Sequence, residues 1–591
     1  MSFYLSPVFF LSILLLSACA TTKVITVEQP QSGAAGRDQT AMAGAVSVDI
    51  TPPPGLPMGG YSIMANKGKG FRTRLKARII YLTDGAGSAT ALVQTDLTAG
   101  SLLVHHQVSS AVAKSTGLKP ADIVIAATHT HSAPVNFFDN DFYNKHMSSG
   151  SGLDARYLAF LTERLSAGIE AAYRRRRPAK VATGSKAIYG YNRNRSLAAY
   201  VLNENINEAD FKDNGAVFRA VNPSLNMIRI DVENAQGEFS PLAAFSSFSV
   251  HATALSPEVE VYNADLFAYA QKDLERIIQN RYHTAWPVVH AMTTGTQGDM
   301  APALRQQGDN TLSHFDLNWP EAKYLGQNIA SEAVQLFESL GAGLTREVKL
   351  ETAAREINIR KHHVVEDVVL CEDAAVGAPV VGGAYERRTP WLSLIPFFQA
   401  GNVLSHRWFF TEGCQGNKSH AGFSFIQSLL EPKGSFPQIA MFQMIRINDA
   451  LILPLPFEVT IEAGRRITSC VKTRFNKKKK DKVKRVWISS NANGYFGYTT
   501  TREEYVQQNY EGGHTLYGRY STPYIKAQLS LLASDLSLLG SVNEMLPQWR
   551  YRLETNEFYP EHKTSTGNRA VVLPPTVHYA QYENEENYVY F

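Results

Sequence analysis

The order of apolar and amphipathic segments near the start of this chain constrains its fold more than any other feature. The apolar runs 78–82, 90–94 and 123–127 predict buried strands, whereas residues 101–115 have the periodicity of a helix. A strand, a helix and a further strand in this order are typical of α/β proteins. We therefore predict an α/β fold in which mixed β-sheets are flanked by helices.

Length and composition limit the possible classes of protein. The 591 residues are 44% hydrophobic and 19% charged, which excludes a chain that is disordered throughout and allows either three domains or one large domain with attachments. The net charge is +4, and the basic runs 174–177 and 477–480 are interpreted as solvated faces. We therefore expect no nucleic-acid partner, and no protein partner is indicated.

The first residues have the pattern of an export signal. An apolar run ends in Leu16-Ser17-Ala18-Cys19, which resembles the bacterial lipobox. We predict that residues 1–18 are a lipoprotein signal peptide, that Cys19 carries a lipid, and that residues 19–42 form a flexible tether. An ordinary signal peptide or an anchor helix is the alternative. The expected location is outside the cytoplasm, at the periplasm or outer membrane, with the N-terminal lipid anchored in a membrane.

The remaining cysteines predict one disulfide. Cys371 and Cys414 flank an irregular insertion within 361–420, and an oxidising compartment lets them pair. Cys470 lies on the apolar side of a predicted helix, which favours a buried free thiol. The insertion itself is either a lid or apolar rim, or an ordinary surface excursion.

Histidines follow two of the predicted strands. His129 and His131 come directly after 123–127, and side chains two apart in extended chain share a face. Ligand sites of α/β folds are frequent at such strand ends. His251 follows the apolar run 243–250. Each of these observations alone is weak, because an isolated histidine after a strand is more often part of the core.

Later segments join these histidines into one ordered pattern. Glu458 follows an apolar strand, and the sequence continues with Asn493-Gly494-Tyr495-Phe496-Gly497-Tyr498 and Tyr510-Glu511-Gly512. With Thr128 to His131, Asn194-Arg195-Ser196, His251 and Gly298-Asp299, these segments resemble the neutral/alkaline ceramidase family. The resemblance covers residues 43–540, which in family terms are one large catalytic domain.

The resemblance implies a zinc site and three catalytic residues. The implied ligands are His129, His251, Glu458 and Tyr498, with Tyr495 as a rival to Tyr498. Imidazoles and a carboxylate are usual zinc ligands, and they leave room for a water whose pKa the metal lowers to about 7.

Around the scissile amide the resemblance places His131, Arg195 and Tyr510. His131 would move the proton from water to the leaving amine, and the other two would donate hydrogen bonds to the oxyanion. Two alternatives remain open. Arg193 could take the place of Arg195, and His131 could only orient a neighbouring group.

The chain departs from the family in two places. The family's Gly-Asp-x-Ser-Pro-Asn appears here as Gly298-Asp299-Met300-Ala301-Pro302-Ala303, so a serine-based mechanism is excluded at this position. The residues after 540 are too few for the family's C-terminal immunoglobulin-like domain, which takes about 100 residues. We expect no complete domain of that kind, and instead a tail, 541–591, docked on the catalytic domain.

Together these features predict a zinc-dependent hydrolase that attacks the amide of ceramide or a related N-acyl lipid with metal-bound water. Ala301 in place of the family serine suggests an acyl amide other than ceramide, or a weakened enzyme. The alternative is a non-catalytic protein that binds a lipid or glycan on the same scaffold.

Overall fold

The computed structural model describes residues 21–30, 33, 38–303, 319–385, 387–401, 413–421, 424–477, 481–560, 576–578 and 588–590. The predicted signal peptide and Cys19 lie outside these residues. The chain divides into two units, Met1–Tyr559 and Pro560–Phe591. Among the described residues, no helix has both the length and the hydropathy needed to cross a membrane.

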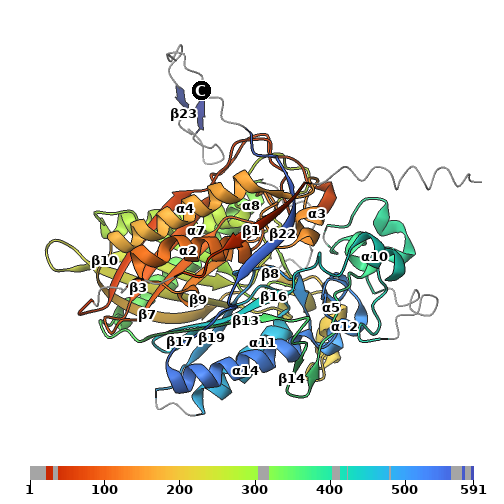
Figure 1. Ribbon diagram of the computed structural model, residues 1–591. Coiled ribbons are helices and arrows are strands. Elements are labelled where there is room, and N and C mark those ends of the chain that lie inside the picture. Colours follow the sequence, from red (N-terminus) through yellow and green to blue (C-terminus); the bar gives the residue numbers. More distant parts are fainter. Residues whose placement is uncertain are drawn as a thin grey trace, which may run out of the picture. The chain divides into compact units, whose positions relative to one another are not determined.

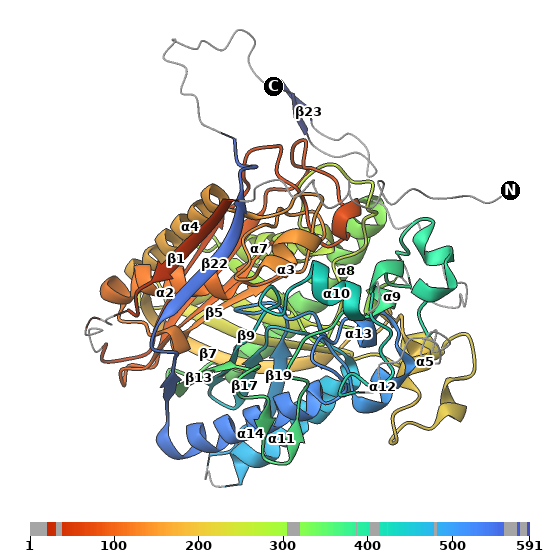
Figure 2. The ribbon, with the colours of Figure 1, turned by 45° about the vertical axis from the view of Figure 1, so that its right-hand side comes forward.

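The two largest sheets of the described residues lie in the larger unit, and both have mixed strand direction (Figures 1 and 2). The first has eight strands, in the order β11 (Val289–Thr294), β10 (Phe239–Phe248), β9 (Ser224–Glu233), β7 (Arg177–Ala187), β2 (Met42–Asp49), β3 (Lys76–Thr83), β4 (Ala89–Thr95) and β5 (Ile123–Ala127). The second has five, in the order β19 (Arg485–Ser489), β17 (Ala450–Pro454), β16 (Ile439–Ile447), β13 (Leu350–Asn358) and β21 (Val542–Glu544).

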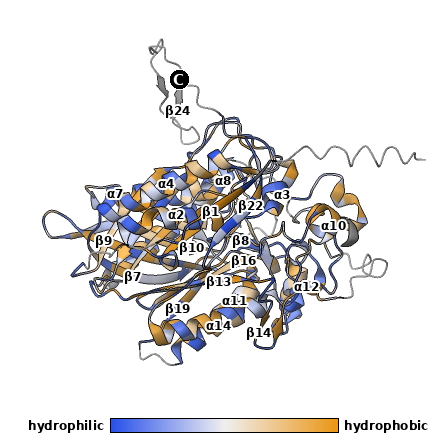
Figure 3. Ribbon diagram, viewed as in Figure 1, coloured by the Kyte–Doolittle hydropathy of each residue, from blue (hydrophilic) through white to orange (hydrophobic). Residues whose placement is uncertain are grey.

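Alternation along the strands builds a four-layer arrangement. In β3, Ile80 and Leu82 belong to a core shared with Ile445 and Ile452 of the five-stranded sheet, whereas Ile79 faces the opposite way. The two sheets therefore pack face to face, and helices cover their outer faces with buried apolar residues. Figure 3 shows that hydrophobic and hydrophilic residues are interspersed along these helices. The covering helices are α2 (Leu102–Thr116), α4 (Ala155–Arg174), α7 (Asp265–Tyr282) and α8 (Trp319–Ser339) on the larger sheet, and α11 (Ile461–Asn476) and α14 (Ser521–Leu539) on the smaller.

These elements confirm the predicted α/β fold of mixed sheets flanked by helices. The sequence that predicted a strand, a helix and a strand forms β4, α2 and β5, and β4 pairs with β5 in parallel. A parallel pair needs a crossover connection, which α2 supplies.

The expected tether of residues 19–42 is wrong over part of its length. Residues Thr21–Val27 form strand β1, which pairs antiparallel with β22 (Trp549–Asn556). β22 also pairs in parallel with β6 (Leu153–Asp154). Side chains alternate between the two faces of a strand, and that of Val27 points into the core, where it is 7% exposed. This segment therefore has both backbone partners and an apolar contact, which a free tether lacks.

The expected docked tail, 541–591, divides at Tyr559. Strands β21 and β22 belong to sheets of the larger unit, whereas Pro560–Phe591 form the separate unit. In that unit the described residues form an antiparallel pair, β23 (Thr576–His578) and β24 (Tyr588–Tyr590). Within the described part of residues 541–591 there is no immunoglobulin-like sandwich.

The predicted pair Cys371 and Cys414 forms a disulfide, with Cα atoms 5.3 Å apart. Cys470 is free, but it is half-buried rather than buried, and its Sγ lies 3.2 Å from Ser530 Oγ. The disulfide lies beside a loop of the C-terminal half, since the Cys371 amide donates to the Tyr517 carbonyl. The insertion is therefore held against residues 513–517, where the Gly377 amide also donates to the Gly513 carbonyl.

Candidate metal centre and active site

Backbone carbonyls orient the two candidate histidine ligands. His129 Nδ1 lies 2.5 Å from the Thr98 carbonyl oxygen, and His251 Nδ1 lies 2.7 Å from that of Gln297. A carbonyl oxygen only accepts hydrogen bonds, so each Nδ1 carries a proton and donates it, and both Nε2 atoms are turned toward the same place. The amide of His251 also donates to the Met300 carbonyl, so a second contact fixes this residue.

The backbone at His129 differs from the extended chain that we expected. Its φ is +63°, in the left-handed region, just after β5 ends. This conformation costs a non-glycine residue energy and is found preferentially at functional sites. The rings of His129 and His131 are nevertheless neighbours, with centroids 4.9 Å apart. The two imidazoles therefore lie side by side through a turn, and not through strand alternation.

Strand pairing places Glu458 beside Tyr498. The short strands β18 (Glu458–Val459) and β20 (Tyr498–Thr499) pair in parallel, with these two residues directly opposite. The Glu458 amide donates to the Gly497 carbonyl. Although burial alone raises the pKa of Glu458, the imidazoles of His129 and His251 lower it well below 4.5, so that the carboxylate is ionised.

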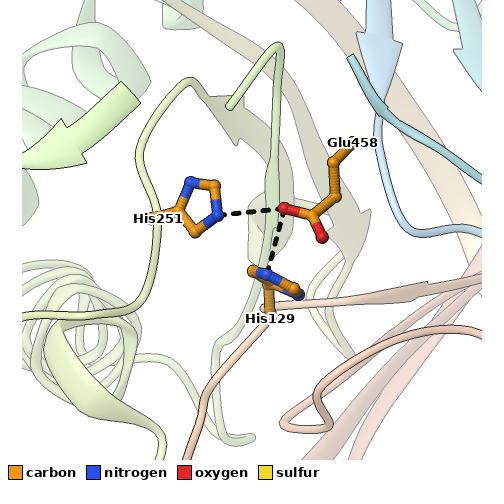
Figure 4. A group of neighbouring side chains, drawn as sticks. All are labelled: His129, His251 and Glu458. Carbon is orange, nitrogen blue, oxygen red and sulfur yellow. Dashed lines mark ion pairs between the residues drawn. The ribbon is translucent and has the colours of Figure 1, made fainter. Parts of the chain in front are cut away.

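The three side chains converge on one point (Figure 4). Glu458 Oε2 lies 3.2 Å from His129 Nε2 and 2.9 Å from His251 Nε2, and all three residues are buried. Zinc ligands at about 2.0–2.2 Å in a tetrahedral arrangement lie about 3.3–3.6 Å from one another. The two nitrogen-to-oxygen distances are slightly shorter than this spacing, and two imidazole nitrogens with a carboxylate oxygen are a ligand set that fits a zinc ion.

The two candidate tyrosines have different neighbours. The Tyr498 hydroxyl lies 3.2 Å from His251 Nε2, on the side of the ring that faces the cluster. The Tyr495 hydroxyl instead donates to Glu458 Oε1 at 2.5 Å, the carboxylate oxygen that faces away from the histidines. The geometry favours Tyr498 over Tyr495 as a fourth ligand. Burial, together with the Glu458 charge, raises the pKa of both phenols well above 10.

A cavity of about 560 Å³ opens beside this cluster. All three residues expected around the reacting amide line it, namely His131, Arg195 and Tyr510. Arg193 is buried in strand β8 (Asn192–Asn194) and is absent from the lining, which favours Arg195 over the alternative. His131 Nε2 lies 3.3 Å from His129 Nε2. Burial and then the imidazoles of His129 and His251 lower the pKa of His131 well below 6.5, so that it is neutral at pH 7.

The carboxylate that holds Arg195 was not predicted from the sequence. Glu511 Oε1 accepts a hydrogen bond from Arg195 Nε at 2.8 Å, and both side chains are buried. Arg195 Nη2 donates to the Gly298 carbonyl at 2.8 Å and to the Tyr498 hydroxyl at 2.9 Å. The signal was available, because Glu511 directly follows Tyr510 in the motif, but only the fold shows its partner.

The Gly298–Ala303 segment supports the site from outside the cavity. It forms strand β12 (Met300–Pro302), which pairs with β8 so that Ala301 lies opposite Arg193. The carbonyl of Asp299 accepts from the Arg195 amide. Ala301 is fully buried and is not among the residues that line the cavity. The missing serine hydroxyl is therefore at a packing position.

This fold and this cluster define an α/β protein with a buried histidine–carboxylate site of the kind that holds a catalytic metal. A family described as neutral/alkaline non-lysosomal ceramidase, N-terminal, matches residues 42–526. The chain belongs to this family.

Individual relatives agree with that assignment. The neutral ceramidase of Pseudomonas aeruginosa is 27% identical over 529 residues, which cover 85% of this chain and 71% of the relative. That of Mycobacterium tuberculosis is 24% identical over 499 residues, covering 81% and 74%. The crystal structure of the Pseudomonas aeruginosa enzyme is similar in fold, with a TM-score of 0.67 and 23% identity over 88% of this chain and 79% of that one.

Proposed function

We propose that this chain is a zinc-dependent hydrolase that cleaves the amide bond of ceramide or a related N-acyl lipid. The observation that carries the proposal is the buried cluster of His129, His251 and Glu458 beside a cavity lined by His131, Arg195 and Tyr510. Membership of the ceramidase family and the names of the relatives support an amide of a lipid as the substrate.

Arg195 would hold the carbonyl oxygen of the amide. Its guanidinium is held in place by hydrogen bonds to Glu511 and to the Gly298 carbonyl. The donor is therefore already oriented before the substrate binds, which is how such groups stabilise an oxyanion. Tyr510 also lines this cavity, and its hydroxyl would be the second donor. When bound, zinc supplies Lewis acidity and lowers the pKa of a water molecule.

His131 would carry the proton between the two halves of the reaction. Its neutral ring can accept a proton at Nε2, the atom nearest the cluster, and then give that proton to the nitrogen of the leaving amine. Tyr61 packs edge-on against this ring, with centroids 4.7 Å apart, and Gly60 leaves no space for a side chain there. The ring is therefore held in one place.

The alternative, a protein that only binds lipid or glycan, was based on Ala301. Because Ala301 lies outside the cavity lining, its methyl group does not remove a contact from the reacting centre. We also propose that the protein is exported and anchored at Cys19 through a lipid, on the strength of the Leu16–Cys19 pattern. Incorporation of labelled palmitate that is abolished in a Cys19→Ala variant tests that anchor.

The decisive experiment measures metal content and hydrolysis in the same samples. We expect about one zinc per native chain, release of fatty acid from N-acylsphingosine or from shorter N-acyl amides, and loss of both in Glu458→Gln. The matched control is Glu238→Gln, an exposed carboxylate, which should keep both. A native protein that contains zinc and is inert on the whole panel would support the binding protein instead.

A further inference from the structure

Exposed apolar side chains gather on three short segments. These are the 3-10 helix η1 (Ser62–Met64), the 3-10 helix η5 (Leu392–Leu394) with its two flanking residues, and the end of helix α10 (Ser424–Leu430). We call the set the apolar rim, and it consists of Ile63, Met64, Trp391, Leu394, Ile395, Leu429 and Leu430. Trp391 is 82% exposed and Leu394 is 69% exposed.

The first two of these segments belong to the mouth of the active-site cavity. Met64 lines the cavity, and so do residues 387–390 just before Trp391. The η1 segment directly follows Tyr61, whose ring packs against His131. Ile63 and Met64 therefore lie two and three residues after the one whose ring packs against His131.

Helix α10 is tied to both other segments. Gln427 accepts a hydrogen bond from the Val376 amide at 3.0 Å, just before α9 (Ala378–Gly382), which packs against the η5 segment. Ser62 donates to the His146 carbonyl, and the imidazole of His146 lies 2.7 Å from Glu431, the residue after Leu430. Figure 2 shows α9 and α10 next to each other. Hydrogen bonds and packing thus link the three segments of the apolar rim, and the first two segments lie at the mouth.

The conformation and charge of the insertion favour a lipid surface as its partner. Trp391 has φ +63°, a left-handed conformation that is uncommon for a bulky residue, and its side chain is exposed. Tryptophan is enriched at membrane interfaces because its side chain combines a large apolar ring with a polar N–H group. Arg388 is exposed beside it, and residues 385–395 contain two arginines and one glutamate, a net positive charge that complements lipid phosphates.

We propose that the apolar rim docks this protein on a lipid bilayer, with Trp391 and Leu394 among the outermost acyl-chain carbons and the cavity mouth facing the membrane. The inference rests on the proposed function, because an N-acyl lipid resides in a bilayer and would otherwise have to cross water. Docking lets the lipid pass from the bilayer into the cavity along apolar side chains, so that little apolar surface is exposed to water.

The first test measures vesicle binding by cosedimentation, in a Cys19→Ala background so that no N-terminal lipid contributes. The vesicles are phosphatidylcholine with about one fifth phosphatidylglycerol, within the anionic range of natural surfaces. We expect Leu394→Asp and Trp391→Ala each to weaken binding about tenfold, which corresponds to about 1.4 kcal/mol. The matched control is Leu539→Asp, at the end of α14, where the leucine is 71% exposed; this variant should bind like the native protein. Equal binding by all variants, or association of the native protein with itself and not with vesicles, would overturn the proposal.

The second test separates docking from chemistry. Leu394→Asp should hydrolyse a short, monomeric N-acyl amide at the native rate and be slowed about tenfold on the same headgroup embedded in vesicles, because only the second substrate requires docking. If native protein hydrolyses neither substrate, the proposed function fails, and the vesicle-binding result still decides docking. If Leu394→Asp matches the native rate on vesicles, the docking proposal alone is refuted.

Discussion

The replacement of Arg195 by alanine tests the division of the site into metal ligands and hydrogen-bond donors. Arg195→Ala removes a guanidinium that donates buried hydrogen bonds to Glu511, Gly298 and Tyr498, without removing any candidate ligand of the histidine–carboxylate cluster. Loss of one oxyanion donor costs about 2.7–4 kcal/mol in the transition state, or a factor of about 10²–10³ in kcat. We therefore expect normal zinc content and a turnover of an N-acyl amide that is lower by this factor.

Arg195→Ala should also lower the free energy of unfolding. Glu511 keeps one donor, the Ser196 hydroxyl at 2.6 Å, but loses its buried counter-ion. Removal of one member of a buried ion pair costs about 3–5 kcal/mol of folding free energy. In the double variant Arg195→Ala/Glu511→Gln no carboxylate is left without its counter-ion, so we expect most of the stability to return while turnover stays low.

The assay combines urea unfolding, zinc analysis and single-substrate kinetics on the native protein, the two single variants and the double variant. Arg195→Lys serves as a conservative comparison, since it keeps the charge but cannot make the forked contacts of a guanidinium. A folded, zinc-loaded Arg195→Ala protein that turns over at the native rate would refute the role of Arg195 as a donor to the carbonyl oxygen.

Three further changes have defined expectations. Tyr498→Phe should weaken zinc binding measured by competition with a chelator, whereas Tyr495→Phe should alter it less, because only the first hydroxyl faces the histidine nitrogens; equal effects would contradict the assignment. Ala301→Ser should change hydrolysis rates less than about tenfold, since one added hydrogen bond is worth about 0.5–1.5 kcal/mol; activity that appears only with the serine would favour the binding protein. His290 is buried, and burial lowers its pKa to about 3, so its stabilising effect is complete above pH 6.5 and is lost as the pH falls toward 3. The unfolding free energy of the native protein should fall between pH 7.5 and pH 5.5, and in His290→Gln this fall should be smaller by about 1.4 kcal/mol. Urea titration at the two pH values measures the difference, with a variant of the exposed His283, His283→Gln, as the control.

The layers of the fold could be predicted where periodicity is strong. The runs that became β3, β4 and β5 are apolar on both faces because they lie between helices and a second sheet. Strand β1 was missed because Thr21–Val27 is mostly exposed and contributes only one buried side chain. Its partner β22 lies more than 500 residues away, and no local pattern indicates a pairing of that separation.

The candidate site could be predicted as a set of residues but not as a geometry. The order of motifs brought His129, His251 and Glu458 into one hypothesis, and the structure brings the three together. The left-handed turn at His129 and the contact between Arg195 and Glu511 were not foreseen, because both depend on which segments meet in space. Likewise, the choice between Tyr495 and Tyr498 as a metal ligand depends on their contacts. Tyr495 contacts Glu458, whereas Tyr498 contacts His251.

The wide spacing of the cluster along the chain has a consequence for how this protein is made. Its members come from residues 129, 251 and 458, and Glu458 is held by its pairing with Tyr498. During synthesis, domains form from the N-terminus onward, and contacts between distant residues close last. A nascent chain that has not yet released Tyr498 therefore has no complete metal site. Zinc would therefore bind only at the end of folding. The rate of zinc binding would report how fast the two sheets pack against each other.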